Sequence, residues 1–322
     1  MGKSDRDALA LLSKPTIVSL KGEDQTKAVL VSAMLHGSEP CGLRAFLHEI
    51  QKQRKYPYNV YFFIGNVKAA QLQPLFSHRF IPGDVNYNRI WDRETKHPVA
   101  QEVCKFFDKI PLLAVLDIHS FTTKKNIPHC FITSDNNSVL QLATPLAPYV
   151  LISDVAQGTL IEHFGQSVPA CTVECGTNNT AAADVYAIET LERFFKYMGL
   201  VAGTIDSVSR GIYHHEVNVK LKPETSVVWA MAQREGYNVT LRSDCEELNL
   251  TLVKSGTVIG WADSLDYFRV VRGKDEIAVT DIFRLDNGAI LLARDCVPTL
   301  ISTSEMIVKE SGFYFFEKYV KS

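Results

Sequence analysis

Short apolar runs alternate with helical patterns over the first two thirds of the chain. The runs at residues 27–34, 59–65 and 112–118 are nearly continuous in apolar residues, which is typical of strands buried on both faces. Further strand-like runs follow at residues 129–134, 149–155 and 169–175. Between and after these runs, apolar residues recur at helical spacing in residues 42–53, 99–110 and 182–201. The alternation predicts an α/β fold, in which helices flank a mixed but mostly parallel sheet.

The pattern changes after about residue 207. From there, short runs of alternating apolar and polar residues are interrupted by Gly, Asp and Asn, as expected for strands joined by tight turns. We therefore predict two domains: a larger one at residues 1–207, which carries the candidate chemistry described below, and a smaller β-rich domain at residues 208–322.

Composition narrows the classes of protein and of partner. The chain has 322 residues, 46% of them hydrophobic and 22% charged, which predicts a folded protein with a sizeable core. A net charge of −2 without a basic run argues against a nucleic-acid partner, and no apolar run approaches the ~20 residues of a membrane span. Seven cysteines without a CxxC pair, together with an N-terminus unlike a secretion signal, predict a cytoplasmic protein. A homo-oligomer is compatible with all of this.

Two histidines and a glutamate follow strand-like runs. His36 and Glu39 come directly after the run 27–34, and His119 comes directly after the run 112–118. Ligands of open α/β sheets bind at the carboxyl ends of the strands, so these side chains are expected at one edge. Two imidazoles and a carboxylate are a typical set of protein ligands for a catalytic zinc. The sequence thus predicts one Zn²⁺ per chain, although these ligand types also suit other divalent metals.

Two more carboxylates belong to the same predicted edge. Asp117 precedes His119 by two residues on a strand, so it faces the same way and can accept the outer N–H of a metal-bound imidazole. Glu174 ends the run 169–175, where it can take a proton from water and deliver it to a leaving amine. Asp117 could also be a plain strand-end aspartate, and Glu174 could form only a salt bridge at the sheet edge, interpretations that the clustering at one edge disfavours.

The polar loop at residues 79–89 contains two arginines, Arg79 and Arg89. The planar guanidinium suits carboxylates and a developing oxyanion. Taken alone, however, the loop is better explained by arginines on the solvent-exposed surface.

Four motifs in a fixed order carry a family resemblance. They are HGSE at 36–39, RF with NRIWD at 79–92, DIHS at 117–120 and VECG at 173–176. In this order they resemble the succinylglutamate desuccinylase/aspartoacylase family of zinc amidohydrolases, which are relatives of the zinc carboxypeptidases. The resemblance covers roughly residues 27–200 and implies a zinc carboxypeptidase-like fold, and the β-rich tail agrees in character with the family's C-terminal domain.

The resemblance also implies a role for each matching residue. Glu174 is implied as the general base and acid, and Arg79 as the residue that polarises the scissile carbonyl. Asn88 and Arg89 match a pair that binds a substrate carboxylate, with Asn86 a competing candidate because about two residues are added after Arg79. The implied zinc ligands are His36, Glu39 and His119.

Two positions bear on substrate choice. Gln166 stands where characterised relatives have an arginine that contacts a second substrate carboxylate, and glutamine offers no matching charge. We therefore expect a substrate other than N-acetylaspartate or N-succinylglutamate. Tyr314 lies where aspartoacylases place an active-site tyrosine, which implies a further substrate contact.

These observations lead to one main hypothesis and two alternatives. The main hypothesis is a zinc-dependent hydrolase that cleaves the non-peptide amide bond of an N-acyl amino acid or a similar small carboxylate-bearing molecule. A metallocarboxypeptidase that acts on short peptides would use the same residues, with Asn88 and Arg89 at the peptide C-terminus. A non-catalytic ligand-binding descendant is the third possibility, and the intact set of ligands and base argues against it.

Overall fold

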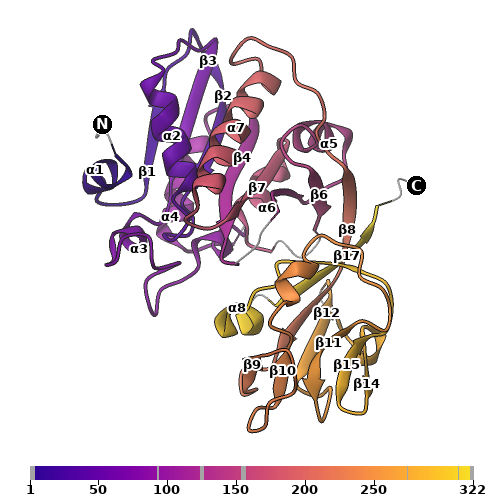
Figure 1. The fold of residues 1–322 in the computed structure, drawn as a ribbon. Helices are drawn as coiled ribbons and strands as arrows, with labels where there is room; N and C mark the ends of the chain where they lie inside the picture. The colour runs from indigo at the N-terminus through magenta and orange to yellow at the C-terminus, as the bar shows by residue number, and fades with distance from the viewer. Residues whose placement is uncertain are drawn as a thin grey trace. The chain divides into compact units, whose positions relative to one another are not determined.

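The computed structural model describes residues 4–92, 94–123, 127–153, 157–273, 275–310 and 312–319. The chain divides into two compact units (Figure 1). The first contains Met1–Phe121 and Pro128–Ile212, and the second begins at Tyr213 and also includes residues 122, 123 and 127. The sequence predicts a single boundary after residue 207 and does not reveal this short contribution to the second unit. None of the described helices has the length and apolar composition of a membrane-spanning segment.

Four neighbouring parallel strands form the centre of the first unit's sheet, in the order β3, β2, β4, β7. They are β2 (Asp24–Ala33), β3 (Tyr58–Ile64), β4 (Leu112–Phe121) and β7 (Ala170–Thr177). Each corresponds to a predicted apolar run, and most of their residues are buried, as near-continuous apolar strands require. The carboxyl ends of β2, β4 and β7 therefore share one edge.

The sheet is mixed, and the expectation that it is mostly parallel is wrong. Strand β1 (Thr16–Leu20) pairs antiparallel with β3, and β5 (His129–Ile132) pairs antiparallel with β7. Strand β6 (Tyr149–Ile152) is parallel to β5 and so also runs against the central four. An apolar run reports burial but not direction, because a buried strand has the same composition whichever way it runs.

Helices cover both faces of this sheet. Consecutive residues of a strand point to opposite faces, and β3 shows it: Phe62 packs on Phe46 of α2 (Cys41–Gln51), while Phe63 packs on Trp91. The face with Phe62 also receives α7 (Ala181–Tyr197), and the face with Phe63 receives α4 (Pro98–Phe107) and α6 (Leu160–Gly165). The other described helices of this unit are α1 (Asp5–Ala10), α3 (Val67–Gln71), η1 (Tyr87–Arg89) and α5 (Asn137–Ala143).

Two strands continue beyond their apolar runs. β4 extends to Phe121, so His119 lies within a strand rather than just after it, and β7 extends to Thr177, so Glu174 lies within its strand as expected but further from the strand's end. The reason is that the hydrogen-bond ladder depends on the backbone and continues through polar residues as long as a partner strand is present. Both side chains are consequently held in the register of the sheet.

The second unit is rich in short, mostly antiparallel strands. In one sheet β8 (Gly211–Leu221) pairs with β12 (Phe268–Arg272) and β17 (Phe313–Lys318), and in the other the order is β14, β15, β11, β10, β9. Phe283 lies in the core between the rings of Phe268 and Phe315. The remaining elements are β9 (Val227–Trp229), β10 (Val239–Leu241), η2 (Cys245–Leu248), β11 (Val258–Ala262), β13 (Asp275–Ile277), η3 (Val279–Asp281), β14 (Phe283–Asp286), β15 (Ala289–Leu292), β16 (Val297–Thr299) and α8 (Glu305–Glu310).

Candidate metal centre

The loop between β2 and α2 presents His36 and Glu39. A backbone hydrogen bond from Glu39 N–H to His36 O, at 3.2 Å, turns the chain so that both side chains lie on the same side. Gly37 lies against α3, where a Cβ atom would be 2.5 Å from the Ala70 nitrogen, so only glycine allows this close approach. Gly37 N–H also donates to Arg79 O at 2.9 Å, which attaches the loop to a distant segment of the chain.

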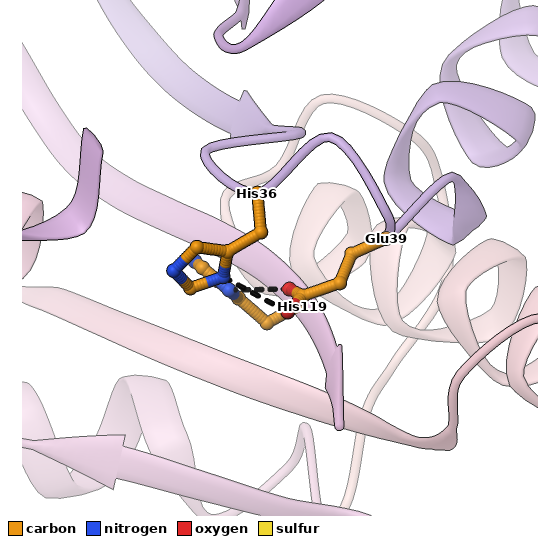
Figure 2. A group of neighbouring side chains, drawn as sticks. All are labelled: His36, Glu39 and His119. Carbon is orange, nitrogen blue, oxygen red and sulfur yellow. Dashed lines mark hydrogen bonds and ion pairs between the residues drawn. The ribbon is translucent and has the colours of Figure 1, made fainter. Parts of the chain in front are cut away.

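His36, Glu39 and His119 meet in a buried cluster. His36 Nδ1 is 2.9 Å from Glu39 Oε1, and His119 Nδ1 is 2.8 Å from Glu39 Oε2. One potential ligand atom from each residue lies within 4.8 Å of the others, and all three residues are at most 2% exposed. Figure 2 shows both loop side chains turned toward His119, which comes from β4, the neighbour of β2 in the sheet.

The outward nitrogen of each imidazole also has a partner. His119 Nε2 is 2.8 Å from Asp117 Oδ2, and this oxygen accepts a hydrogen bond from Thr172 Oγ1 at 3.3 Å. His36 Nε2 is 3.0 Å from Asn86 Oδ1. Sequence reasoning considered Asn86 only as an alternative substrate ligand and missed this contact, because nothing in the pattern links two loops 50 residues apart.

The electrostatics of the cluster are consistent with a cation site. Burial, with help from Arg79, lowers the pKa of His36 to about 4, so this imidazole is neutral at neutral pH. Burial raises the pKa of Glu39, but the two histidines outweigh it and hold that pKa well below its usual range. Burial likewise lowers the pKa of His119, but Asp117 and Glu39 outweigh it and raise that pKa well above its usual value.

The residues fit a zinc ion. His36 Nδ1 is buried and has no hydrogen-bond partner in the described part of the chain, so its lone pair is available. An ionised carboxylate and a second imidazole complete a set of nitrogen and oxygen donors of the kind that zinc accepts. A metal would displace the proton between His119 Nδ1 and Glu39, since metal ligands must be deprotonated.

Glu174 lies beside the cluster on the neighbouring strand. It is in register with His119 across the β4 and β7 pair, and its side chain is buried, with 9% of the residue exposed. Burial, reinforced by the charge of Glu39, raises the pKa of Glu174 to about 8 despite the opposing effect of His119 and Arg79. Its Oε2 atom has no hydrogen-bond partner among the described residues. A carboxyl group in this state can exchange a proton near neutral pH.

A third histidine shares this row. His129 of β5 is fully buried and lies in register with Glu174 on the side opposite to His119. Residues in register on neighbouring strands project to the same face. Sequence reasoning predicted the strand but missed the histidine, because the row exists only once β5 is known to run antiparallel to β7.

Arg79 reaches the cluster in spite of the added residues that follow it. Its Nη1 atom donates to Glu39 Oε1 at 2.9 Å, and 16% of its side chain remains exposed. The guanidinium thus adjoins both the ligand carboxylate and the solvent-accessible side of the site.

Asn88 and Arg89 make other contacts. Asn88 is buried, and its Oδ1 accepts a hydrogen bond from Leu160 N–H at 3.3 Å, at the start of α6. Arg89 is exposed and lines an open cavity of about 670 Å³ together with Asp92, Glu94 and Lys96. The described residues that line this cavity do not include the three candidate ligands.

Gln166 is not brought to the cluster by any described contact. Gln166 is exposed at the carboxyl end of α6, just before β7 begins, whereas Glu174 lies in the second half of β7. Tyr314 belongs to β17 of the second unit, where it pairs with Asn218 and its ring lies 5.7 Å from that of His215. The predicted residues that the structure gathers in one place are His36, Glu39, Arg79, Asp117, His119 and Glu174.

No protein-family model and no curated protein matches the chain. Solved structures do match it over most of its length. A succinylglutamate desuccinylase/aspartoacylase from Rhodobacter sphaeroides has a TM-score of 0.62 at 15% identity, over 94% of this chain and 89% of that one. An aspartoacylase family protein from Mesorhizobium loti gives 0.56 at 12% identity, over 95% and 89%. The product-bound ectoine utilization protein of Ruegeria pomeroyi gives 0.52 at 14% identity, over 87% and 81%. The family resemblance read from the motifs is therefore confirmed in the fold, and the chain has the fold of the succinylglutamate desuccinylase/aspartoacylase proteins.

Proposed function

We propose that this protein is a zinc-dependent hydrolase that cleaves the amide bond of an N-acyl amino acid or a similar small carboxylate-bearing molecule. The observation that carries the proposal is the convergence of His36, Glu39 and His119, with the raised-pKa carboxyl of Glu174 beside them. The fold shared with desuccinylase and aspartoacylase structures supports the same class of reaction. We also propose a cytoplasmic location, which is supported by the seven cysteines, all of them unpaired.

Under this proposal His36, Glu39 and His119 would hold the metal. A bound zinc ion would supply Lewis acidity, which makes water a usable nucleophile at neutral pH and polarises a carbonyl. Asp117 accepts the outer N–H of His119 and thereby keeps Nδ1 directed at the centre. The buried position of all four residues excludes bulk water and strengthens their electrostatic interactions.

Glu174 moves the proton. As a carboxylate it takes a proton from the attacking water, and as a carboxylic acid it passes that proton to the nitrogen of the departing amine. In the metal-free protein burial raises the pKa of Glu174 to about 8, which brings both protonation states of this carboxyl within reach near neutral pH. Arg79 donates from the edge of the site, where it can stabilise negative charge that develops on the carbonyl oxygen.

Metal analysis and a substrate panel test the proposal together. We expect about one zinc per chain in the wild type, loss of zinc in His36→Ala and His119→Ala, and full zinc content with strongly reduced turnover in Glu174→Gln. The panel would contain N-acyl amino acids beside dipeptides. Turnover of dipeptides alone would favour the metallocarboxypeptidase alternative, and zinc binding without any turnover would favour a binding protein. A wild type that takes up no metal when zinc is supplied would refute the proposal.

A further inference from the structure

The two histidines of the candidate centre are supported by chemically different groups. His119 Nε2 faces the carboxylate of Asp117, which is fully buried, whereas His36 Nε2 faces the neutral side-chain amide of Asn86. We propose that Asn86 is the positioning residue of His36: it holds the imidazole in the tautomer that leaves Nδ1 free for a metal, and it links the loop at residues 79–89 to the centre. The metal-binding part of this inference rests on the proposed function.

The hydrogen bonds identify which atom of Asn86 faces His36. The backbone N–H of Asn88 donates to Asn86 Oδ1 at 2.8 Å, and a backbone N–H can only donate. The side-chain atom that receives it must therefore be the oxygen and not the amide nitrogen, which removes the usual ambiguity of an asparagine. Since that oxygen can only accept, His36 Nε2 carries the hydrogen and the neutral ring leaves Nδ1 unprotonated.

The unprotonated nitrogen is directed at an anion. His36 Nδ1 lies 2.9 Å from Glu39 Oε1, without a hydrogen bond in the described structure. A nitrogen lone pair and a carboxylate oxygen that face each other repel unless a proton or a cation lies between them. Asn86 disfavours the tautomer that carries the hydrogen on Nδ1, because moving the hydrogen there would break the bond between Nε2 and Oδ1. The lone pair of His36 Nδ1 is thereby left available to a cation beside Glu39 Oε1.

The neutral character of Asn86 distinguishes it from Asp117. An anionic partner makes an imidazole a stronger electron donor to a metal than a neutral amide partner does. Replacing Asn86 by Asp keeps an acceptor oxygen for both bonds and adds negative charge near the centre. We therefore expect Asn86→Asp to bind zinc at least as tightly as the wild type, and Asn86→Ala to bind it more weakly.

Asn86 also connects the loop to the centre. It precedes η1, and its oxygen caps that short helix through Asn88 N–H. At the start of the loop, Arg79 is joined to the HGSE segment through Gly37 N–H and Glu39. The loop is thus attached to the candidate ligands at two points, so a shift of His36 would be transmitted to η1.

Two measurements test the proposal. The first is the zinc dissociation constant, from competition with a chromophoric chelator, for the wild type, Asn86→Ala, Asn86→Asp and Asp117→Asn. The second is the ¹⁵N NMR spectrum of the His36 ring in the metal-free protein, which reports its tautomer. We expect Asn86→Ala to weaken zinc binding about 10- to 100-fold and to convert the Nε2–H form of His36 into a mixture. The matched control is Val85→Ala, an exposed neighbour in the same loop, which should behave as the wild type.

The possible outcomes separate this inference from the proposed function. Unchanged zinc affinity and tautomer in Asn86→Ala would overturn the role of Asn86 while the metal site itself stands. A weakened site in Val85→Ala as well would show a general effect of the loop and would also overturn it. If the wild type binds no zinc, the proposed function fails, and the tautomer alone decides whether Asn86 positions His36. Should Asn86→Ala not fold, weaker zinc binding by Asn86→Asp than by the wild type would overturn the proposal.

Discussion

The candidate centre has one half built on strands and one half built on loops. Asp117, His119 and Glu174 belong to β4 and β7, and their alignment is set by the hydrogen-bond ladder between those strands. His36 and Arg79 belong to loops that are joined by individual bonds, such as Gly37 N–H to Arg79 O. The strand-built half is therefore held by a continuous ladder of hydrogen bonds, whereas each contact of the loop-built half can be lost separately. Substitutions in the strand-built half should change turnover or stability. Substitutions in the loop-built half should also shift the neighbouring side chains of the site.

The largest effect is expected at the strand-built half. Glu174→Gln removes the group that moves the proton while preserving size, so turnover should fall by about 10²- to 10⁴-fold with the zinc content unchanged. Steady-state kinetics and elemental analysis measure the two quantities. Glu189→Gln, on the exposed surface of α7, is the matched control and should match the wild type. Loss of zinc from Glu174→Gln would contradict its assignment as the base.

Arg79→Ala tests the loop-built half. Turnover should fall by about 10²- to 10³-fold, because one donor to the developing oxyanion is removed. Zinc should be retained, since loss of the guanidinium leaves Glu39 Oε1 more available to a cation. If Arg79→Lys turns over substrate as fast as the wild type, the planar guanidinium is not required, which would contradict the prediction.

The pH dependence of stability in the zinc-free protein tests the raised pKa of Glu174. Its pKa is raised from 4.5 to about 8 in the folded protein, so between these values the folded chain keeps a proton that the unfolded chain has released. Unfolding therefore releases a proton and becomes easier as pH rises. Relative to Glu174→Gln, the zinc-free wild type should lose about 1.4 kcal/mol of unfolding free energy per pH unit within this window, and nothing below it. Denaturant titrations at pH 4, 6 and 7.5 measure this difference, and a constant difference would contradict burial of the neutral carboxyl.

The smallest effect is expected at Thr172, whose hydroxyl donates to Asp117 Oδ2. Thr172→Val keeps the branched shape but removes this bond, which should lower the free energy of unfolding by about 1 kcal/mol. Thermal unfolding of the zinc-free protein gives the value, with Thr280→Val, an exposed threonine of the second unit, as the control. An unchanged midpoint would indicate that Asp117 needs no support from β7.

The strand-built half of the site is also easier to predict from the sequence than the loop-built half. The strands β2, β4 and β7 are recognisable as apolar runs, and the residues at their carboxyl ends follow from that recognition. His119 was placed just after its strand, although it lies within β4, because the ladder continues past the apolar residues, whereas Glu174 was placed within its strand and lies there. The contact of Asn86 with His36 and the place of His129 beside Glu174 could not be predicted, since these neighbours come from distant segments.

The sequence by itself determined which segments become buried strands and helices, and which residue types can hold a metal and move a proton. These properties depend on local composition and on the chemistry of single side chains. Only the tertiary structure decided that β5 and β6 run against the central strands, that Arg79 reaches Glu39, and that Asn86 supports His36. The physical reason is that apolar periodicity encodes burial but carries no direction and no identity of the partner. Direction and pairing are settled when segments far apart in the chain pack together and satisfy their hydrogen bonds.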